Sequence, residues 1–181
     1  MEIFSGAPSD VAEREEKEKR VYGLLESLNI AYERCDHAAA QTMADCEAVD
    51  RALGVDMCKN LFLCNRQKTD FYLLLIPADK PFKTKELSAQ LGVSRLSFGG
   101  AEDMERLLDI HPGAVSVMGL MNDTAGQVRL LVDNDLKESE YFGCHPCVNT
   151  SSLKIKSADI FEKFLPAVKH EPTYITLIGN E

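Results

Sequence analysis

Two apolar runs on either side of a short polar segment constrain the fold more than any other feature of the sequence. The run NLFLC ends at residue 64, the polar segment NRQKTD follows, and FYLLLIPADK begins at residue 71. Two strand-like runs joined by a polar turn predict a β-hairpin. Continuous apolar runs of this length are typical of fully buried strands. We therefore expect the hairpin near the centre of a sheet, with the core built around it.

Helical and strand-like patterns alternate along the rest of the chain, without internal repeats. Apolar residues at helical spacing predict helices over residues 10–28, 42–54, 83–92, 101–110 and 158–168. Strand patterns cover residues 30–37, 94–98, 126–134, 150–155 and 173–178, and residues 111–123 are expected to be irregular or weakly helical. The expected N-caps are Asp10, Thr42 and Ser157, and the expected helix ends are Gly54 and Gly92. Strands paired by a hairpin, with separate helices, indicate an α+β or mixed α/β domain.

The length and composition set the size and class of the domain. A chain of 181 residues, 45% of them apolar, can bury one substantial core, so we expect a single domain. No run approaches the roughly 18 apolar residues of a membrane span. The acidic N-terminus also lacks the apolar core of a signal peptide. We therefore expect a cytoplasmic protein with no membrane partner, whose six cysteines stay reduced.

The charge is acidic overall but uneven along the chain. A net charge of −9 argues against a protein that coats nucleic acid nonspecifically. Residues 59–95 nevertheless carry seven bases and three acids, and the bases include Arg66, Lys68, Lys83 and Lys85. This basic block is either an ordinary solvated surface or a local face that binds phosphates.

The segment Cys144-His145-Pro146-Cys147 has three chemical interpretations. A redox C-x-x-C pair normally opens a helix, but the segment that follows is β-prone, which argues against a redox pair. A structural zinc site would need a second ligand pair, and the other cysteines lack a suitable spacing, so we expect no metal. The third interpretation is a histidine aimed at a substrate: the proline favours extended backbone at His145, and Gly143 would allow a tight turn before it. A turn histidine bonded to a carbonyl remains the alternative.

Lys59 and Asn60 stand at the start of the first hairpin strand. A lysine beside an apolar strand is costly to desolvate unless a partner uses its charge. It either extends its ammonium group to solvent or presents it to a carbonyl or phosphate group. In a regular strand these two side chains point to opposite faces. A single site therefore requires a bend in the strand, or direct substrate contact by only one of them.

Four segments together resemble the YbaK/ProX family of aminoacyl-tRNA deacylases, the editing domains associated with prolyl-tRNA synthetase. These segments are KNLFL, RLSFGGAEDMERLL, HPGAVSVMGLMND and GCHPCVNTSSLKI. The resemblance covers residues 19–178 and leaves residues 1–18 as the acidic N-terminal part of the first helix. It is strongest to the free-standing ProX or PrdX branch, which hydrolyses alanyl-tRNA(Pro). The G-x-R-G element of the cysteinyl-tRNA(Pro) branch is not found in this sequence.

The resemblance implies a curved mixed β-sheet surrounded by helices and a small pocket for the aminoacyl group. It implies that Lys59, Asn60 and His145 are the catalytic residues. The implied substrate-binding residues are Gly113, Ala114, Ser116, Met118 and Asn149. Many relatives carry Pro-Phe or Pro-Leu where this chain has Val117-Met118, so the amino-acid preference is the least determined property. Cys144 and Cys147 lie outside the family pattern.

The implied reaction is hydrolysis of an ester between an amino acid and a ribose hydroxyl. The sequence offers no G-x-S-x-G nucleophile and no nucleotide-binding glycine motif, so we expect catalysis by oriented water without a cofactor. The expected partners are the acceptor end of aminoacyl-tRNA(Pro), bound by Arg66, Lys68, Lys83 and Lys85, and prolyl-tRNA synthetase. The expected assembly is a monomer or weak homodimer. Cysteinyl-tRNA(Pro) hydrolysis, a non-catalytic tRNA- or synthetase-binding module and a thiol oxidoreductase are the alternatives.

Overall fold

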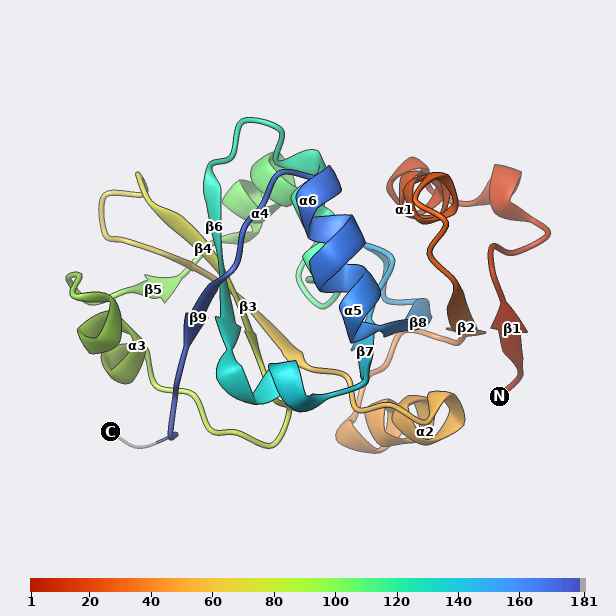
Figure 1. Cartoon of the computed structure of the whole chain (residues 1–181), viewed down its shortest axis with the longest axis horizontal. Coiled ribbons are helices and arrows are strands. Elements are labelled where there is room, and N and C mark those ends of the chain that lie inside the picture. Colours follow the sequence, from red (N-terminus) through yellow and green to blue (C-terminus); the bar gives the residue numbers. More distant parts are fainter. Residues whose placement is uncertain (180–181) are drawn as a thin grey trace.

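Two β-sheets form the framework of the computed structural model, which describes residues 1–179 (Figure 1). The four-stranded sheet is antiparallel, in the order β1 (Ile3–Ser5), β2 (Tyr32–Asp36), β8 (Ser151–Lys156), β7 (Tyr141–Cys144). The five-stranded sheet is mixed, in the order β5 (Ser97–Phe98), β3 (Lys59–Cys64), β4 (Phe71–Ile76), β6 (Val128–Asp133), β9 (Thr173–Ile175). The mixed α/β fold expected from the sequence is therefore confirmed. Its strands divide into two sheets, and a parallel bridge between Met57 and Gly143 joins the segment before β3 to β7.

The predicted hairpin forms the centre of the five-stranded sheet. Strands β3 and β4 pair antiparallel, with Asn60 opposite Leu75 and Cys64 opposite Phe71. Every residue of β4 is buried. Strands β6 and β9 extend the sheet in parallel beyond β4. Apolar side chains on both faces of the hairpin therefore hold two core regions together.

Helices cover both sheets. Their bounds are α1 (Glu16–Ser27), α2 (Met43–Leu53), α3 (Thr84–Leu91) and α4 (Ala101–Leu108), followed by a C-terminal helical segment of α5 (Ser157–Asp159), a π-helical turn (Ile160–Phe164) and α6 (Leu165–Ala167). Short 3-10 turns span Val11–Glu13, Val117–Asn122 and Asn134–Glu138. Helices α1 and α2 lie beside the four-stranded sheet, and α3 lies at the opposite end of the molecule (Figure 1). Among residues 1–179, no helix has the length and apolar character needed to cross a membrane.

The local signals for α2 and α3 are confirmed. The Thr42 hydroxyl accepts from the amide of Asp45, and the Asp45 carboxylate accepts from the amide of Thr42, which completes a capping box. Gly54 ends α2 and Gly92 ends α3, both in the left-handed region. Glycine suits these helix ends because it has no Cβ to oppose positive φ.

Several predicted boundaries are wrong, at the two ends of the chain and at one strand in its middle. The first α-helix begins at Glu16 instead of residue 10. Asp10 precedes the 3-10 turn Val11–Glu13 without a side-chain cap bond, and its carboxylate accepts from the Arg14 guanidinium. Residues 1–18 are therefore only partly helical, and β1 joins the four-stranded sheet through β2. The last helical segment has Lys156 as its N-cap, and the Ser157 hydroxyl makes no cap bond. The strand predicted over 94–98 shortens to β5.

Gly143 serves close packing and not the predicted tight turn. It lies within β7, paired with Lys154, and its backbone is not in the left-handed region. A Cβ at this position would lie 2.8 Å from Met57 Sδ and 3.3 Å from the Asp56 carbonyl oxygen. The missing side chain therefore lets the segment before β3 approach β7 closely enough to bridge the two sheets.

Candidate functional site

The His145 side chain and backbone are both held in place where β7 ends. Its Nδ1 lies 2.9 Å from the carbonyl oxygen of Ser151, at the start of β8. The Ser116 hydroxyl donates to the carbonyl oxygen of His145 over 2.6 Å and accepts from the amide of Met118. A half-buried imidazole is thus fixed between β8 and the loop that carries Ser116.

The bond to Ser151 indicates which tautomer of His145 is present. A carbonyl oxygen accepts hydrogen bonds only, so Nδ1 carries the hydrogen and Nε2 keeps its lone pair when the ring is neutral. Desolvation lowers the pKa of His145, and the nearby His37 lowers it further, although the bond to Ser151 acts in the opposite direction. At neutral pH His145 therefore presents an acceptor nitrogen that can orient water or receive a proton.

The predicted pocket loop approaches the His145 turn. Gly113 has a φ of +93°, and a Cβ there would lie 3.7 Å from the Asn149 amide nitrogen. Ala114 and Ser116 are buried next to this turn of the chain. Met118 is also fully buried, but within the main core cluster. The structure thus gathers Gly113, Ser116 and Asn149 near His145, while the Met118 side chain belongs to the main core cluster.

Asn60 and Lys59 occupy opposite faces of β3. The strand is regular, with Lys59 opposite Ile76 and Asn60 opposite Leu75, so the bend considered from the sequence is absent within β3. Asn60 shares its face with Phe62, in the core cluster that also contains Cys144. Its amide nitrogen donates to the carbonyl oxygen of Cys58 over 3.0 Å, and its buried Oδ1 has no hydrogen-bond partner among residues 1–179.

The ammonium group of Lys59 points the other way. It donates to the carbonyl oxygen of Lys80 over 2.7 Å, on the face that packs against α3. The described hydrogen bonds and ion pairs do not join Lys59 to His145. The structure therefore brings Asn60 toward the His145 side of the sheet but leaves Lys59 on the other side.

The two cysteines beside His145 are inert in this structure. Cys144 and Cys147 are free and buried. Desolvation raises the pKa of Cys147 to about 12 and raises the pKa of Cys144 as well. Reactive thiols need a lowered pKa, so this geometry disfavours a thiol oxidoreductase. Within the described part of the chain, no three His, Cys, Asp or Glu side chains gather in a way that could hold a metal ion.

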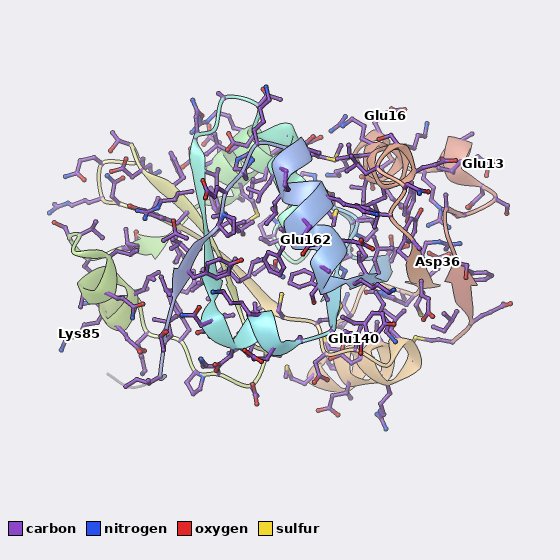
Figure 2. All side chains as sticks on the ribbon, in the orientation of Figure 1. Glu13, Glu16, Asp36, Lys85, Glu140 and Glu162 are labelled. Carbon is purple, nitrogen blue, oxygen red and sulfur yellow. The ribbon has the colours of Figure 1, made fainter. Side chains whose placement is uncertain are left out.

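The predicted tRNA-binding residues lie away from His145. Arg66 and Lys68 belong to the turn between β3 and β4, while Lys83 and Lys85 belong to the start of α3. Figure 2 shows Lys85 at one end of the long axis and Asp36 near the other. Asp36 accepts from the hydroxyl of Ser151, whose carbonyl oxygen contacts His145. A ligand that touches both regions must therefore extend along the molecule.

A polar network around His145 was not predicted from the sequence. Asp36 accepts from Arg14 and Arg34 as well as from Ser151. His37, the next residue, contacts the Ser152 hydroxyl with its Nε2 over 2.8 Å. The available signal was a run of charged and polar residues at the end of a strand, ERCDH. Such a run is typical of an ordinary strand end, and only its pairing with β8 shows that it belongs to the site.

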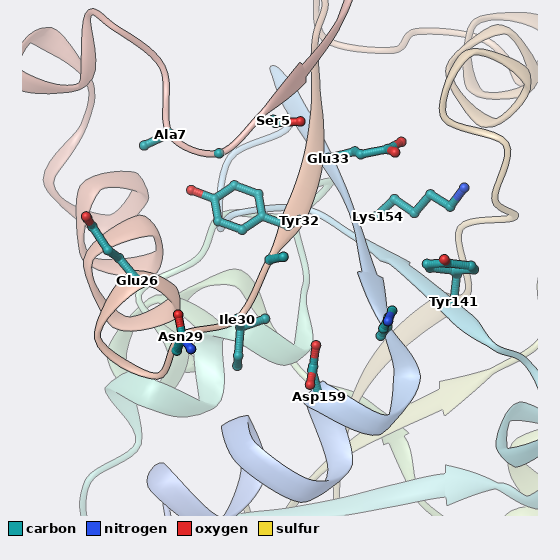
Figure 3. A pocket seen from close by; sticks show the side chains of 13 residues that line it. Ser5, Ala7, Glu26, Asn29, Ile30, Tyr32, Glu33, Tyr141, Lys154 and Asp159 are labelled. Atoms are coloured by element: carbon teal, nitrogen blue, oxygen red, sulfur yellow. The ribbon is translucent and has the colours of Figure 1, made fainter.

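A separate hollow of about 710 Å³ lies at the end of the four-stranded sheet, near the C-terminus of α1. Its lining includes Tyr32, Tyr141, Lys154 and Asp159 (Figure 3). The Lys154 ammonium lies 4.5 Å from the centre of the Tyr141 ring. None of the predicted catalytic or substrate-binding residues lines this hollow.

The family model and the similar proteins carry names that concern tRNA editing or prolyl-tRNA synthetase. The family model described as "Aminoacyl-tRNA editing domain" matches residues 37–163. The prolyl-tRNA editing protein ProX of Acetoanaerobium sticklandii is 28% identical over 147 residues, which cover 81% of this chain and 89% of that protein. The prolyl-tRNA synthetase associated domain-containing protein 1 of Danio rerio is 28% identical over 160 residues, with 87% and 86% covered.

The solved structures support the fold. A candidate trans-editing enzyme for prolyl-tRNA synthetase superposes with a TM-score of 0.64 at 14% identity, over 91% of this chain and 99% of that one. The hypothetical protein APE2540 superposes with a TM-score of 0.63 at 17% identity, over 84% and 96%. At these identities the likeness concerns the arrangement of helices and strands.

Proposed function

Because this chain belongs to the aminoacyl-tRNA editing domain family, we propose that it hydrolyses mischarged tRNA(Pro) in trans, with alanyl-tRNA(Pro) as its preferred substrate. The observation that carries the chemistry is the fixed tautomer of His145, with Nδ1 bonded to Ser151 and Nε2 left as an acceptor. The free-standing ProX protein, 28% identical, supports the choice of tRNA(Pro).

The proposed reaction uses water and the side chains around His145. The aminoacyl ester is already activated, so an oriented water can attack it without a protein nucleophile. Nε2 of His145 accepts a hydrogen bond from that water or from the aminoacyl end. Asn60 supplies the unpaired Oδ1 at a buried position, where an unmatched polar atom favours a ligand donor. The Ala114 amide already donates to the carbonyl oxygen of His111, so the neighbouring backbone amides of Gly113, Val115 and Ser116 are the proposed donors to the developing oxyanion.

Selection by size in a second, smaller pocket is the proposed reason for the preference for alanine. A synthetase pocket shaped for proline excludes alanine poorly, because each missing methylene is worth only about 1–3 kcal/mol. A smaller pocket reverses the selection by admitting alanine and rejecting proline on steric grounds. Gly113, Ala114 and Ser116 keep the proposed pocket narrow, since none of them has a side chain longer than two heavy atoms.

A substrate panel tests this proposal directly. We expect the protein to deacylate alanyl-tRNA(Pro) well above the spontaneous rate and to leave prolyl-tRNA(Pro) intact. Single-turnover release of labelled amino acid measures both, with cysteinyl-tRNA(Pro) as the third substrate. Faster release of cysteine would assign the cysteine preference instead. If none of the three is hydrolysed although the tRNA binds, the protein is a binding module.

The tRNA body is proposed to bind along the basic residues at the α3 end. Arg66, Lys68, Lys83 and Lys85 would contact phosphates of the acceptor stem, while the 3′ end reaches the His145 side. So few cations give weak and strongly salt-dependent binding. Prolyl-tRNA synthetase is the proposed protein partner, and a monomer or weak homodimer is the proposed assembly.

The lowered pKa of His145 makes a prediction for the pH dependence of deacylation. The neutral ring is the active form, so the enzymatic rate relative to spontaneous hydrolysis should persist below the usual histidine pKa of about 6.5. It should then fall as the pH drops through the lowered pKa, because protonation removes the Nε2 acceptor. Rates measured from pH 5 to 8 check this, and His145→Gln should abolish the acid limb. A limb at or above the ordinary histidine value would contradict the assignment.

A further inference from the structure

A second histidine lies beside His145 and contacts it through a serine. His37 follows β2, and its ring centre lies 6.4 Å from that of His145. The Ser152 hydroxyl lies between them, 2.8 Å from His37 Nε2 and 3.4 Å from His145 Nδ1. Both rings are half-buried on the same side of the four-stranded sheet.

Each hydrogen bond needs one donor and one acceptor, and this requirement fixes the direction of the bonds between His37, Ser152 and His145. His37 Nδ1 lies 2.8 Å from the carbonyl oxygen of Ala38, so it carries the hydrogen and Nε2 is an acceptor. The Ser152 hydroxyl must therefore donate to His37. The Ser152 oxygen then turns its lone pairs toward His145, whose Nδ1–H donates mainly to the carbonyl oxygen of Ser151. Each hydrogen bond between His37, Ser152 and His145 therefore has one donor and one acceptor.

We propose that His37 is a positioning residue for His145, acting through the Ser152 hydroxyl to hold the His145 ring with Nδ1 protonated and Nε2 free for the substrate. Without His37, the Ser152 hydroxyl loses its acceptor and is free to turn its hydrogen toward the His145 ring. The competing Nε2-protonated tautomer of His145 would then gain a donor at Nδ1. His37 thus excludes the wrong tautomer as well as the wrong ring orientation.

The charge interaction that lowers the pKa of His145 comes from His37. Asp36 approaches His145 only through Ser151, and its charge is matched by Arg14 and Arg34. The flanking thiols Cys144 and Cys147 have raised pKa values and stay protonated. A positive charge on His37 lowers the pKa of His145, so removing this imidazole should raise that pKa.

The first test uses the free protein and does not depend on the proposed reaction. Nitrogen-15 NMR of the histidine rings reports the tautomer and pKa of His145 in the wild type, His37→Ala and His37→Gln. We expect His37→Ala to show a mixture of tautomers and a raised His145 pKa. Glutamine can accept from Ser152 but cannot titrate, so His37→Gln should keep the tautomer while the pKa still rises. An unchanged tautomer and pKa in His37→Ala would overturn the proposal.

The second test rests on the proposed function and measures alanyl-tRNA(Pro) deacylation. His37→Ala should lower kcat about tenfold with KM changed less than twofold, because the ring is misplaced and no substrate contact is lost. His37→Gln should recover most of kcat. In a Ser152→Ala background the His37→Ala change should have little further effect, since the relay is already broken. Additive losses would overturn the relay, whereas a wild type without deacylation would reject the proposed function and leave the NMR result to decide this inference.

Discussion

Replacing Lys59 with alanine is expected to reduce alanyl-tRNA(Pro) deacylation about 10- to 100-fold while the protein stays folded. The ammonium group donates to a neutral acceptor, the carbonyl oxygen of Lys80, over 2.7 Å. Charged acceptors form stronger bonds with ammonium groups, so a substrate phosphate can displace this contact. The flexible four-carbon stem allows that exchange. Lys59 faces away from the His145 side of β3, so its expected partner is a substrate phosphate. A hydrogen bond to a charged group contributes about 1.5–3 kcal/mol, which corresponds to roughly 10- to 100-fold in rate.

Matched variants separate this role from a general loss of charge. Lys59→Arg keeps the charge but changes its shape, so it should retain part of the rate. Lys163→Ala removes an exposed lysine of the C-terminal helical segment and should leave the rate unchanged. Single-turnover rates and circular dichroism of all three variants give the comparison. Normal turnover by Lys59→Ala would show that the lysine has no contact with the substrate.

Replacing Asp36 with asparagine is expected to destabilise the fold by about 3 kcal/mol. Arg34 is 3% exposed and pairs with Asp36, which also accepts from Arg14 and from the Ser151 hydroxyl. Removing one partner leaves a buried guanidinium without its counter-charge, which typically costs about 3–5 kcal/mol. The partial exposure of Asp36 places the expected value at the lower end. Urea unfolding at pH 7 measures it.

The pH dependence of this loss gives a second check. The guanidinium groups hold the pKa of Asp36 well below its usual range, although desolvation opposes them. A depressed pKa contributes stability above the unfolded value of about 3.9, and this stability is lost progressively as the pH falls further. The difference between wild type and Asp36→Asn should therefore shrink below about pH 4. Asp79→Asn, at an exposed carboxylate, should change stability by less than about 0.5 kcal/mol. Equal losses in the two variants would contradict the assigned role of Asp36.

Local chemistry made the hairpin and the middle helices predictable. The two apolar runs around residues 65–70 and the capping pair of Thr42 with Asp45 each act over a few residues. The predicted start of α1 was wrong: Asp10 precedes a 3-10 turn without a side-chain cap bond, and its carboxylate accepts from Arg14. Strand β1 was missed because three residues carry no reliable period, and its pairing with β2 decides its conformation.

The candidate site was likewise predicted only in part from the sequence. His145 stood out because proline and glycine flank it in the sequence. The explanation given for Gly143 was wrong, since the requirement for glycine comes from Met57 and Asp56, more than 80 positions earlier in the chain. His37 and Ser152 could not be paired from the sequence, because only the register of β2 with β8 brings them together.

The sequence by itself determined the mixed α/β class, the central hairpin, the family and the residues worth testing. Those properties follow from periodicity, capping and motifs, which act between neighbours in the chain. Only the tertiary structure decided that Lys59 and Asn60 face opposite sides of β3 without a bend, and which nitrogen of His145 is free. The first depends on the regular pairing of β3 with β4. The second depends on the turn after β7, which brings the carbonyl oxygen of Ser151 back to His145 from six residues further along the chain. Strand pairing and the conformation of this turn are set by the folded structure, and no residue pattern encodes either of them.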